Sequence, residues 1–211
     1  CGGPEKDLKL NGEFRPTINL KSGNKVIVNS VSTLRKHGFK KIFVIARHRL
    51  LTRIFEVLKD GSNRGVKVEY IEEKKSNGTA ASLKALKGRI KTPFLVVYGD
   101  IVFSNIDLSQ LWSTHTHQNS LATLLLTTSP KPHEKGNATV EGSRILNFVQ
   151  KPKKSTNYLV FSPIFVCEPE VLNSDGDVLE YDVFPRLAQE GLLSGHLSSQ
   201  KEKHIHSLDD V

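Results

Sequence analysis

Apolar positions along the chain follow two spacings, which predict strands alternating with helices. The segments KKIFVIA (40–46) and FLVVYGDIVF (94–103) are short and rich in β-branched residues, as is typical of buried strands. Elsewhere apolar side chains recur every three or four positions and stop at glycines such as Gly38 and Gly61, which predicts helices. We expect helices at 26–37, 49–60, 79–86, 106–117 and 178–190, and further strands at 66–73, 121–128 and 159–167.

The second half of the chain adds a β portion to this alternation. Residues 137–149 predict a hairpin that turns at Glu141-Gly142-Ser143. Strand–helix units followed by such a portion predict an α/β fold: a Rossmann-like, doubly wound and mostly parallel sheet with a β extension over its ligand cleft. We expect residues 1–211 to form one domain. Because Cys1-Gly2-Gly3 is typical of a strand's end entering a loop, we expect the first strand to lie before residue 1.

Asp100 interrupts one of the predicted buried strands. A buried strand does not tolerate an unpaired charge, and Gly99 allows the backbone to turn just before the carboxylate. In open α/β sheets, ligands bind at the carboxyl ends of parallel strands. The position therefore predicts a ligand or metal site, and the alternative is a turn residue that caps its own backbone.

Composition narrows the cellular context and the partners. The 211 residues are 37% hydrophobic and contain no apolar run long enough for a membrane span, so we expect no membrane partner. Two cysteines, Cys1 and Cys167, form no metal or disulfide pattern, and with no visible signal peptide they favour the cytoplasm. The net charge of +8 attracts polyanions, which include nucleic acid and phosphorylated small molecules.

Several short motifs, in a shared order, resemble those of the sugar-phosphate nucleotidyltransferases. These enzymes join a nucleoside triphosphate to a sugar 1-phosphate and release pyrophosphate. The motifs are CGG (1–3), Arg15-Pro16, YIEEKKSNGTAASL (70–83), FLVVYGDI (94–101), FVQKP (148–152), EPEVL (168–172) and DVFPRLAQEG (182–191). The resemblance spans nearly the whole chain and implies a divergent member with a GT-A-like nucleotidyltransferase fold and no C-terminal β-helix domain.

The resemblance implies a catalytic role for three side chains. Asp100 would hold a Mg²⁺ ion, with Mn²⁺ as the alternative, because hard cations prefer carboxylate oxygens. Arg15 would contact the nucleotide phosphates, and Lys151 the sugar 1-phosphate. Lys151 lies in a lysine-rich run, so a solvated surface position is its alternative. Near the chain's end, HIHSLDDV aligns His204 with the family's second metal-binding carboxylate.

Further residues are implied in ligand binding. The backbone of Gly2 and Gly3 would cradle phosphate, since a side chain there would block its approach. Gly78 and Thr79 lie in the nucleotide-recognition segment, and Gln150 would hydrogen-bond a sugar hydroxyl. The expected ligands are thus a nucleoside triphosphate and a hexose 1-phosphate, and a homo-oligomer is left open.

The chain also departs from the family at positions that carry chemistry. The arginine of the family's phosphate loop is absent, and Lys6 is a loose substitute without a bidentate fork. The family's sugar-contacting Asn-Ala-Gly is replaced by Phe161-Ser162-Pro163. His204 is a neutral imidazole where a carboxylate is expected, and imidazole is a poor Mg²⁺ ligand.

Three functional classes therefore stay open. The first is an active sugar-1-phosphate nucleotidyltransferase, and the second is a catalytically silent relative that binds nucleotide or sugar phosphate in a regulatory role. The third is a nucleic-acid-binding protein, which no recognition helix or aromatic stacking motif supports. His115 and His117 are two positions apart on a predicted helix, where side chains do not face together, so we expect both on the surface.

Overall fold

The computed structural model describes residues 9–10, 12–74, 78–154 and 157–205 of the chain. The chain divides into two compact units. We call the first unit 1 (Cys1–Gly78, Tyr98–Asn105 and Glu202–Val211) and the second unit 2 (Thr79–Val97 and Ile106–Lys201). Among the described residues, none of the helices is both long and apolar enough to cross a membrane.

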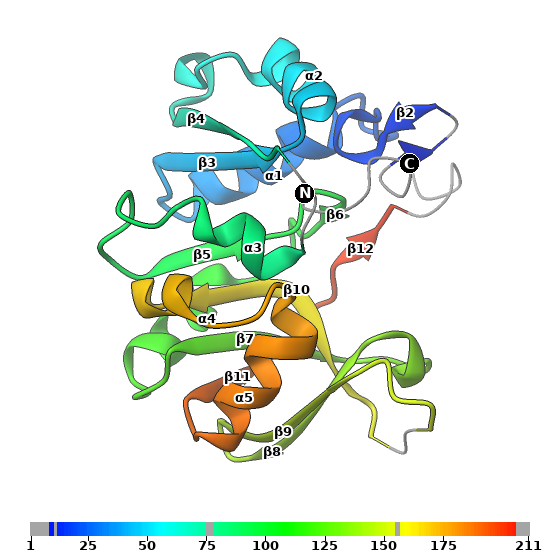
Figure 1. Ribbon diagram of the computed structural model, residues 1–211. Helices are drawn as coiled ribbons and strands as arrows, with labels where there is room; N and C mark the ends of the chain where they lie inside the picture. Colours follow the sequence, from blue (N-terminus) through cyan, green and yellow to red (C-terminus); the bar gives the residue numbers. More distant parts are fainter. Residues whose placement is uncertain (1–8, 11, 75–77, 155–156, 206–211) are drawn as a thin grey trace. The chain divides into compact units, whose positions relative to one another are not determined.

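Unit 1 is built around two parallel strands, β3 (Lys41–Ala46) and β4 (Lys67–Glu72). The helices α1 (Val26–Lys36) and α2 (His48–Leu58) precede and follow β3, as the spacing of apolar residues predicts. Figure 1 shows these elements in blue and cyan, and α2 packs on both strands. Shorter elements complete the unit: β1 (Lys9–Leu10), β2 (Glu13–Phe14), and the 3₁₀ turns η2 (Arg15–Thr17) and η3 (Ser62–Arg64).

The core of unit 1 contains buried apolar residues from both helices and from the strand pair. In β3 the alternate residues Val44 and Ala46 are buried in this core, because successive side chains of a strand point to opposite faces. The remaining members of the core are Phe14, Ile27, Val28, Val31, Leu50, Ile54, Leu58, Val66 and Val68. This burial is what holds two short strands and two helices together, since a strand pair alone is marginally stable.

A second strand pair in unit 1 joins segments far apart in sequence. The strand β6 (Ile101–Val102) pairs antiparallel with β12 (Lys203–His204). The pair is extended by a hydrogen bond from the Ile205 amide to the Asp100 carbonyl, at 3.1 Å. Ile101 and Ile205 are fully buried, so the end of the described chain is fastened beside Asp100.

Unit 2 contains a mixed six-stranded sheet in the order β5-β10-β7-β11-β9-β8. Its strands are β5 (Phe94–Val97), β7 (Ala122–Thr128), β8 (Gly136–Glu141), β9 (Arg144–Gln150), β10 (Leu159–Cys167) and β11 (Leu193–Leu197). The strands β7 and β10 are buried along almost their whole length, which explains why their sequences are apolar without alternation. The predicted hairpin is confirmed as β8 and β9, which turn at Gly142.

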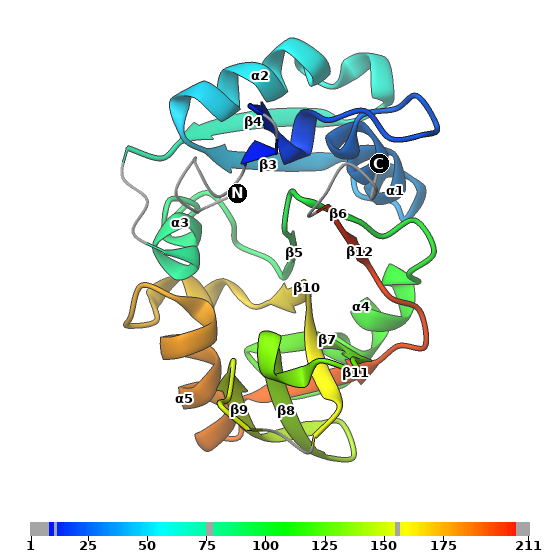
Figure 2. The ribbon, with the colours of Figure 1, turned by 90° about the vertical axis from the view of Figure 1, so that its right-hand side faces the viewer.

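Helices on unit 2 follow the predicted positions with shorter bounds. They are α3 (Thr79–Lys84), α4 (Leu108–Thr116) and α5 (Phe184–Gln189), with 3₁₀ turns η4 (Pro132–Glu134) and η5 (Pro169–Asn173). The predicted helix at 178–190 begins with a π-helical turn, η6 (Leu179–Val183), before α5. Pro185 accounts for this change because it has no amide hydrogen to donate to the preceding turn. Figure 2 shows α5 close to β9, on which it packs.

The predicted α/β class is confirmed, and the strand directions refine it. Parallel pairing holds for β3 with β4 and for β7 with β11. The other pairs of the six-stranded sheet are antiparallel, which gives unit 2 a more mixed sheet than the alternation of strands and helices predicts. Apolar periodicity sets which face of a strand is buried, whereas strand direction depends on connections that this pattern does not encode.

Candidate functional site

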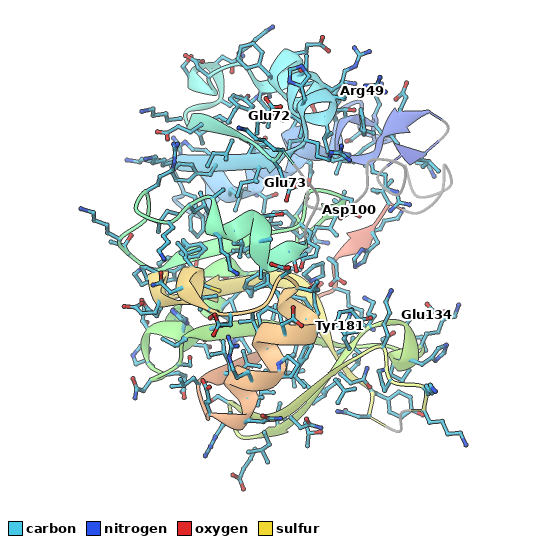
Figure 3. The ribbon with its side chains drawn as sticks, viewed as in Figure 1. Arg49, Glu72, Glu73, Asp100, Glu134 and Tyr181 are labelled. Atoms are coloured by element: carbon cyan, nitrogen blue, oxygen red, sulfur yellow. The ribbon has the colours of Figure 1, made fainter. Side chains whose placement is uncertain are left out.

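Asp100 lies in unit 1, in the turn Gly99-Asp100 immediately before β6 (Figure 3). Its side chain is 21% exposed, so the carboxylate is neither in open solvent nor sealed in the core. The strand β5 ends at Val97 and β6 begins at Ile101. The charge of Asp100 therefore lies in the turn between two strands and not within a buried strand. The backbone carbonyl of Asp100 accepts a hydrogen bond from the Ile205 amide, and the carboxylate lies near a cation.

That cation is Arg15, whose Nη1 lies 3.6 Å from Oδ2 of Asp100. Arg15 opens the turn η2, where Pro16 and Thr17 are buried and the Thr17 hydroxyl donates to the Phe14 carbonyl at 3.0 Å. The Nε atom of Arg15 is buried and has no hydrogen-bond partner among the described residues. An ion pair of this length contributes little to stability, and a buried donor without an acceptor is costly. The arrangement leaves Arg15 able to donate to an anionic ligand.

Lys151 and Gln150 lie in unit 2, at the end of β9. Lys151 has a φ of 46°, in the left-handed region that non-glycine residues rarely adopt, and its amide donates to the Lys135 carbonyl at 3.0 Å. The Gln150 Oε1 atom is buried and has no partner in the part of the chain that the structure describes. A Cβ atom on Gly136 would clash with the buried ring of Phe148 and lie 2.7 Å from this oxygen, so glycine fits best opposite Gln150. Backbone strain together with an unpaired buried oxygen is typical of a binding position.

Gly78 and Thr79 lie where the nucleotide-recognition segment meets α3. Gly78 has a φ of 118°, which favours glycine. The Thr79 hydroxyl donates to Oε2 of Glu180 at 2.8 Å and accepts from the Leu179 amide at 2.9 Å. This hydroxyl therefore fastens α3 to η6. The two glycines expected to cradle phosphate, Gly2 and Gly3, lie outside the described residues, as does Lys6.

His204 has a partner that the sequence motifs did not indicate. Its Nε2 lies 3.0 Å from Oε1 of Glu202, with the imidazole N–H as donor. The Glu202 side chain is only 1% exposed, whereas that of His204 is 24% exposed. The signal for this pair is its spacing, because Glu202 directly precedes β12 and side chains two positions apart in an extended chain point to the same side. The register also pairs His204 with Ile101 rather than with Asp100.

These contacts bear on whether the residues fit the metal ion that the family implies. Within the described ranges, no group of three or more histidine, cysteine, aspartate or glutamate side chains is arranged to hold a metal ion. Mg²⁺ keeps several waters and is commonly bound by one or two carboxylates together with substrate phosphates. Asp100 fits that pattern as a single, partly exposed carboxylate. His204 does not fit it, because imidazole suits softer metals and this ring is hydrogen-bonded to Glu202.

Phe161, one of the departures from the family, belongs to the core of unit 2. Its ring packs edge-to-face against Phe148 and Phe184, and tilted against Phe165, with centroids 5.5–6.1 Å apart. Ser162 is fully buried, and the pairing of β10 with β7 shifts register between Ser162 and Phe165. A cluster of aromatic rings therefore occupies the position where the resemblance implies a sugar-contacting surface.

His115 corrects an expectation from the sequence, since it is buried rather than on the surface. Its side chain is 1% exposed and lies on the same face of α4 as Leu108 and Leu111. The Nε2–H donates to Oε1 of Glu168 at 3.2 Å, and Nδ1 accepts from the Thr123 hydroxyl at 2.9 Å. His117 is exposed, so the two rings do not form a metal pair. The helical stripe of residues 108, 111 and 115 was the signal that could have placed His115 in the core.

The buried ring of His115 predicts a pH dependence of stability. Burial lowers the pKa of His115, and the neighbouring Glu168 charge opposes the shift only in part. An unfolded histidine titrates near pH 6.5, so below that pH the unfolded chain binds a proton that folded His115 resists. The stabilisation is therefore complete above about pH 6.5 and is lost as the pH falls from there toward the lowered pKa.

We expect the free energy of unfolding to fall less between about pH 7.5 and about pH 5.5 in His115→Gln than in the wild-type protein. The wild-type loss includes a share from His196, whose pKa is also lowered by burial, and this share remains in the variant. Urea denaturation followed by the fluorescence of Trp112, the single tryptophan, reports on unit 2 directly. Equal pH dependence in the two proteins would contradict a neutral, buried His115.

Comparison with known proteins places these features in a family. Residues 14–195 match the model of the nucleotidyl transferase family. A mannose-1-phosphate guanyltransferase from Aspergillus oryzae is 25% identical over 188 residues, which cover 84% of this chain and 51% of that protein. The mannose-1-phosphate guanylyltransferase catalytic subunit beta of Xenopus tropicalis is 25% identical over 178 residues, covering 80% of this chain and 49% of the relative.

Solved structures agree with the fold. A "Putative Glucose-1-Phosphate Thymidylyltransferase" from Bacillus anthracis, crystallised with a sucrose, superposes with a TM-score of 0.82 at 17% identity. The match covers 93% of this chain and 83% of that one. The chain spans about a third to a half of the length of the first curated relatives it matches. Since the family model covers most of the chain, the protein belongs to the nucleotidyl transferase family.

Proposed function

We propose that the protein transfers a nucleotidyl group from a nucleoside triphosphate to a sugar 1-phosphate. A phosphate oxygen of the sugar 1-phosphate would attack the α-phosphorus, a new phosphorus–oxygen bond would form, and the bond to the β-phosphate would break as pyrophosphate leaves. The observation that carries this proposal is the pair Arg15–Asp100, in which a partly exposed carboxylate lies 3.6 Å from a guanidinium whose Nε is buried and has no partner among the described residues. Such a pair offers one group to a metal ion and one to an anion.

Each described residue has a role that its contacts support. Arg15 would bind the triphosphate, because guanidinium N–H groups match phosphate oxygens in number and direction. Asp100 would hold Mg²⁺ or Mn²⁺, which when bound neutralises phosphate charge as the pyrophosphate leaves. Arg15 would then pair with phosphate in place of the carboxylate.

The residues proposed to bind the acceptor substrate, the sugar 1-phosphate, lie in unit 2. Lys151 would neutralise the phosphate of the sugar 1-phosphate, and the strained backbone would hold its side chain in one direction. The buried Oε1 of Gln150 accepts but cannot donate, so it would select a sugar hydroxyl as donor. Gly78 would allow the nucleotide to approach the backbone before α3. Positioning and electrostatic stabilisation of this kind can supply most of the rate of such a transfer.

A catalytically silent relative that binds the same ligands in a regulatory role is the second candidate. Two observations favour it: His204 is hydrogen-bonded to Glu202, and Phe161 belongs to an aromatic cluster in the core. Glu202 is only 1% exposed and is hydrogen-bonded to His204, so it does not offer a second exposed carboxylate beside Asp100. The active enzyme would turn over its substrates and the silent relative would not, whereas both would bind the same ligands.

The deciding experiment measures pyrophosphate release with a panel of triphosphates and hexose 1-phosphates, each with Mg²⁺ and with Mn²⁺. The names of the relatives make GTP with mannose 1-phosphate and dTTP with glucose 1-phosphate the first pairs to assay. We expect turnover with at least one pair, and we expect Lys151→Ala to weaken binding of the sugar phosphate more than that of the nucleotide. Nucleotide binding by calorimetry without turnover would instead establish the silent relative, and absence of both would contradict both candidates.

A further inference from the structure

A second set of cations lies in unit 1 at the amino ends of β3 and β4. Helix α1 ends at Lys36, shortly before β3, and η3 ends at Arg64, shortly before β4. Arg35 lies in the last turn of α1 and Arg64 in η3, and these two elements pack on each other. His48 and Glu72 lie at the opposite, carboxyl ends of the same two strands.

The Arg35 side chain lies against the backbone at Gly65, the residue after Arg64. A Cβ atom on Gly65 would be 2.9 Å from Nε of Arg35 and 3.6 Å from its Nη2. Gly65 also has a φ of 69°, which favours glycine at the end of η3. The Arg35 guanidinium thus lies next to the turn that carries Arg64, at a position where the backbone favours glycine.

Neither guanidinium has an acceptor among the described residues. The Nε of Arg64 is buried without a hydrogen-bond partner, although Arg64 as a whole is only partly buried. No side-chain hydrogen bond or ion pair joins Arg35 or Arg64 to another residue in the described part of the chain. A buried donor without an acceptor is unfavourable, and an anion would supply the acceptor that the Arg64 Nε lacks.

The carboxylates of this region are already engaged. Glu69 binds Lys41 at 3.3 Å and Lys67 at 3.2 Å. Asp60 accepts from the amide and the hydroxyl of Ser62, at 3.0 and 2.7 Å. The partial negative charge at the carboxyl end of α1 favours cations there, but it supplies no acceptor to the Arg64 Nε.

We propose that Arg35 and Arg64 bind a phosphate group. A guanidinium presents parallel N–H donors that match two phosphate oxygens, and a dianion would neutralise both arginines at once. The same chemistry is offered by inorganic phosphate, by pyrophosphate and by the phosphate ester of a nucleotide or sugar. The site is separate from Arg15 and Asp100, and it does not depend on the proposed transfer reaction.

The test measures binding of inorganic phosphate, pyrophosphate and a nucleoside monophosphate by calorimetry at constant ionic strength, with chloride as the reference anion. The full chain carrying Arg15→Gln is used as the background, so that phosphate bound at the proposed catalytic residues does not contribute. We expect saturable binding of at least one of the phosphates, which Arg35→Gln and Arg64→Gln each weaken by about tenfold or more. The matched control is Lys36→Gln, which removes the same charge from the next residue of α1 and should change the affinity by about threefold or less.

An amide NMR spectrum supplies an independent readout. Phosphate addition should shift the Gly65 resonance in the Arg15→Gln protein and should leave it in place when Arg64 is also replaced. Absence of saturable binding would overturn the proposal. So would an equal loss of affinity in Lys36→Gln, or binding of a single-stranded oligonucleotide in preference to every small phosphate, since either would indicate a diffuse basic surface for polyanions.

Discussion

Replacing Asp100 with asparagine is expected to abolish most pyrophosphate release, with kcat lowered by about a hundredfold or more. The amide keeps the shape of the side chain but loses the charge that would hold a divalent cation, and asparagine is a weaker ligand for Mg²⁺. The same change removes the ion pair with Arg15, at 3.6 Å, but leaves Arg15 itself unchanged. The nucleotide phosphates therefore keep their guanidinium partner. We therefore expect the loss in kcat with little change in nucleotide affinity measured without metal.

The measurement is a steady-state assay over a range of Mg²⁺ concentrations, because loss of a metal ligand also raises the concentration needed for half-maximal rate. Asp175→Asn is the matched control, since Asp175 is exposed and undergoes the same change of charge. Circular dichroism and thermal unfolding establish that both variants are folded. A rate for Asp100→Asn within about threefold of the wild type would contradict the metal role of Asp100.

Replacing Phe184 with alanine is expected to lower the free energy of unfolding of unit 2 by about 3–5 kcal/mol. Phe184 is fully buried and packs edge-to-face on Phe148, Phe161 and Phe165, with centroids 5.4–5.5 Å away. Removal of the ring leaves a cavity that the three facing rings cannot fill, because β9 holds Phe148 and β10 holds Phe161 and Phe165. The chain would lose both the transfer free energy of the ring and its aromatic contacts.

Chemical denaturation followed by Trp112 fluorescence measures this loss, since Trp112 is in unit 2. Phe184→Leu retains most of the buried volume and should cost about 1–2 kcal/mol. Tyr181→Ala is the control for an exposed ring, because Tyr181 is 59% exposed and also lies in unit 2. A cost for Phe184→Ala no larger than for Tyr181→Ala would mean that the cluster does not support unit 2.

The aromatic cluster also bears on the chemistry. Since Phe161 is part of the cluster, polar contacts to a sugar must come from other positions, of which Gln150 and Lys151 are the described candidates. The same reasoning applies to His204, whose ring is joined to the buried Glu202. Phe161 and His204, two positions where the chain departs from the family, thus each have a local structural role. An assay with several metals and sugars is therefore more informative than an assay with one substrate of the family.

The sequence by itself determined the helices, the longer strands up to residue 167 and the family. Periodicities of two and of three to four residues depend only on neighbouring positions, so they placed β3, α1, α2 and the hairpin β8–β9 close to their observed bounds. The order of short motifs was sufficient for the resemblance, which the family model over residues 14–195 confirms. Gly99 followed by a carboxylate was also sufficient to indicate a break in the strand before Asp100.

Tertiary structure alone decided which residues meet. Arg15 and Asp100 are 85 positions apart, and their contact depends on η2 and the β6 turn packing in one unit. The pairing of Glu202 with His204, the burial of His115 by β7, and the approach of Arg35 to Gly65 likewise depend on which elements pack together. Local periodicity carries no information about such contacts, because burial and strand register follow from packing between segments remote in sequence.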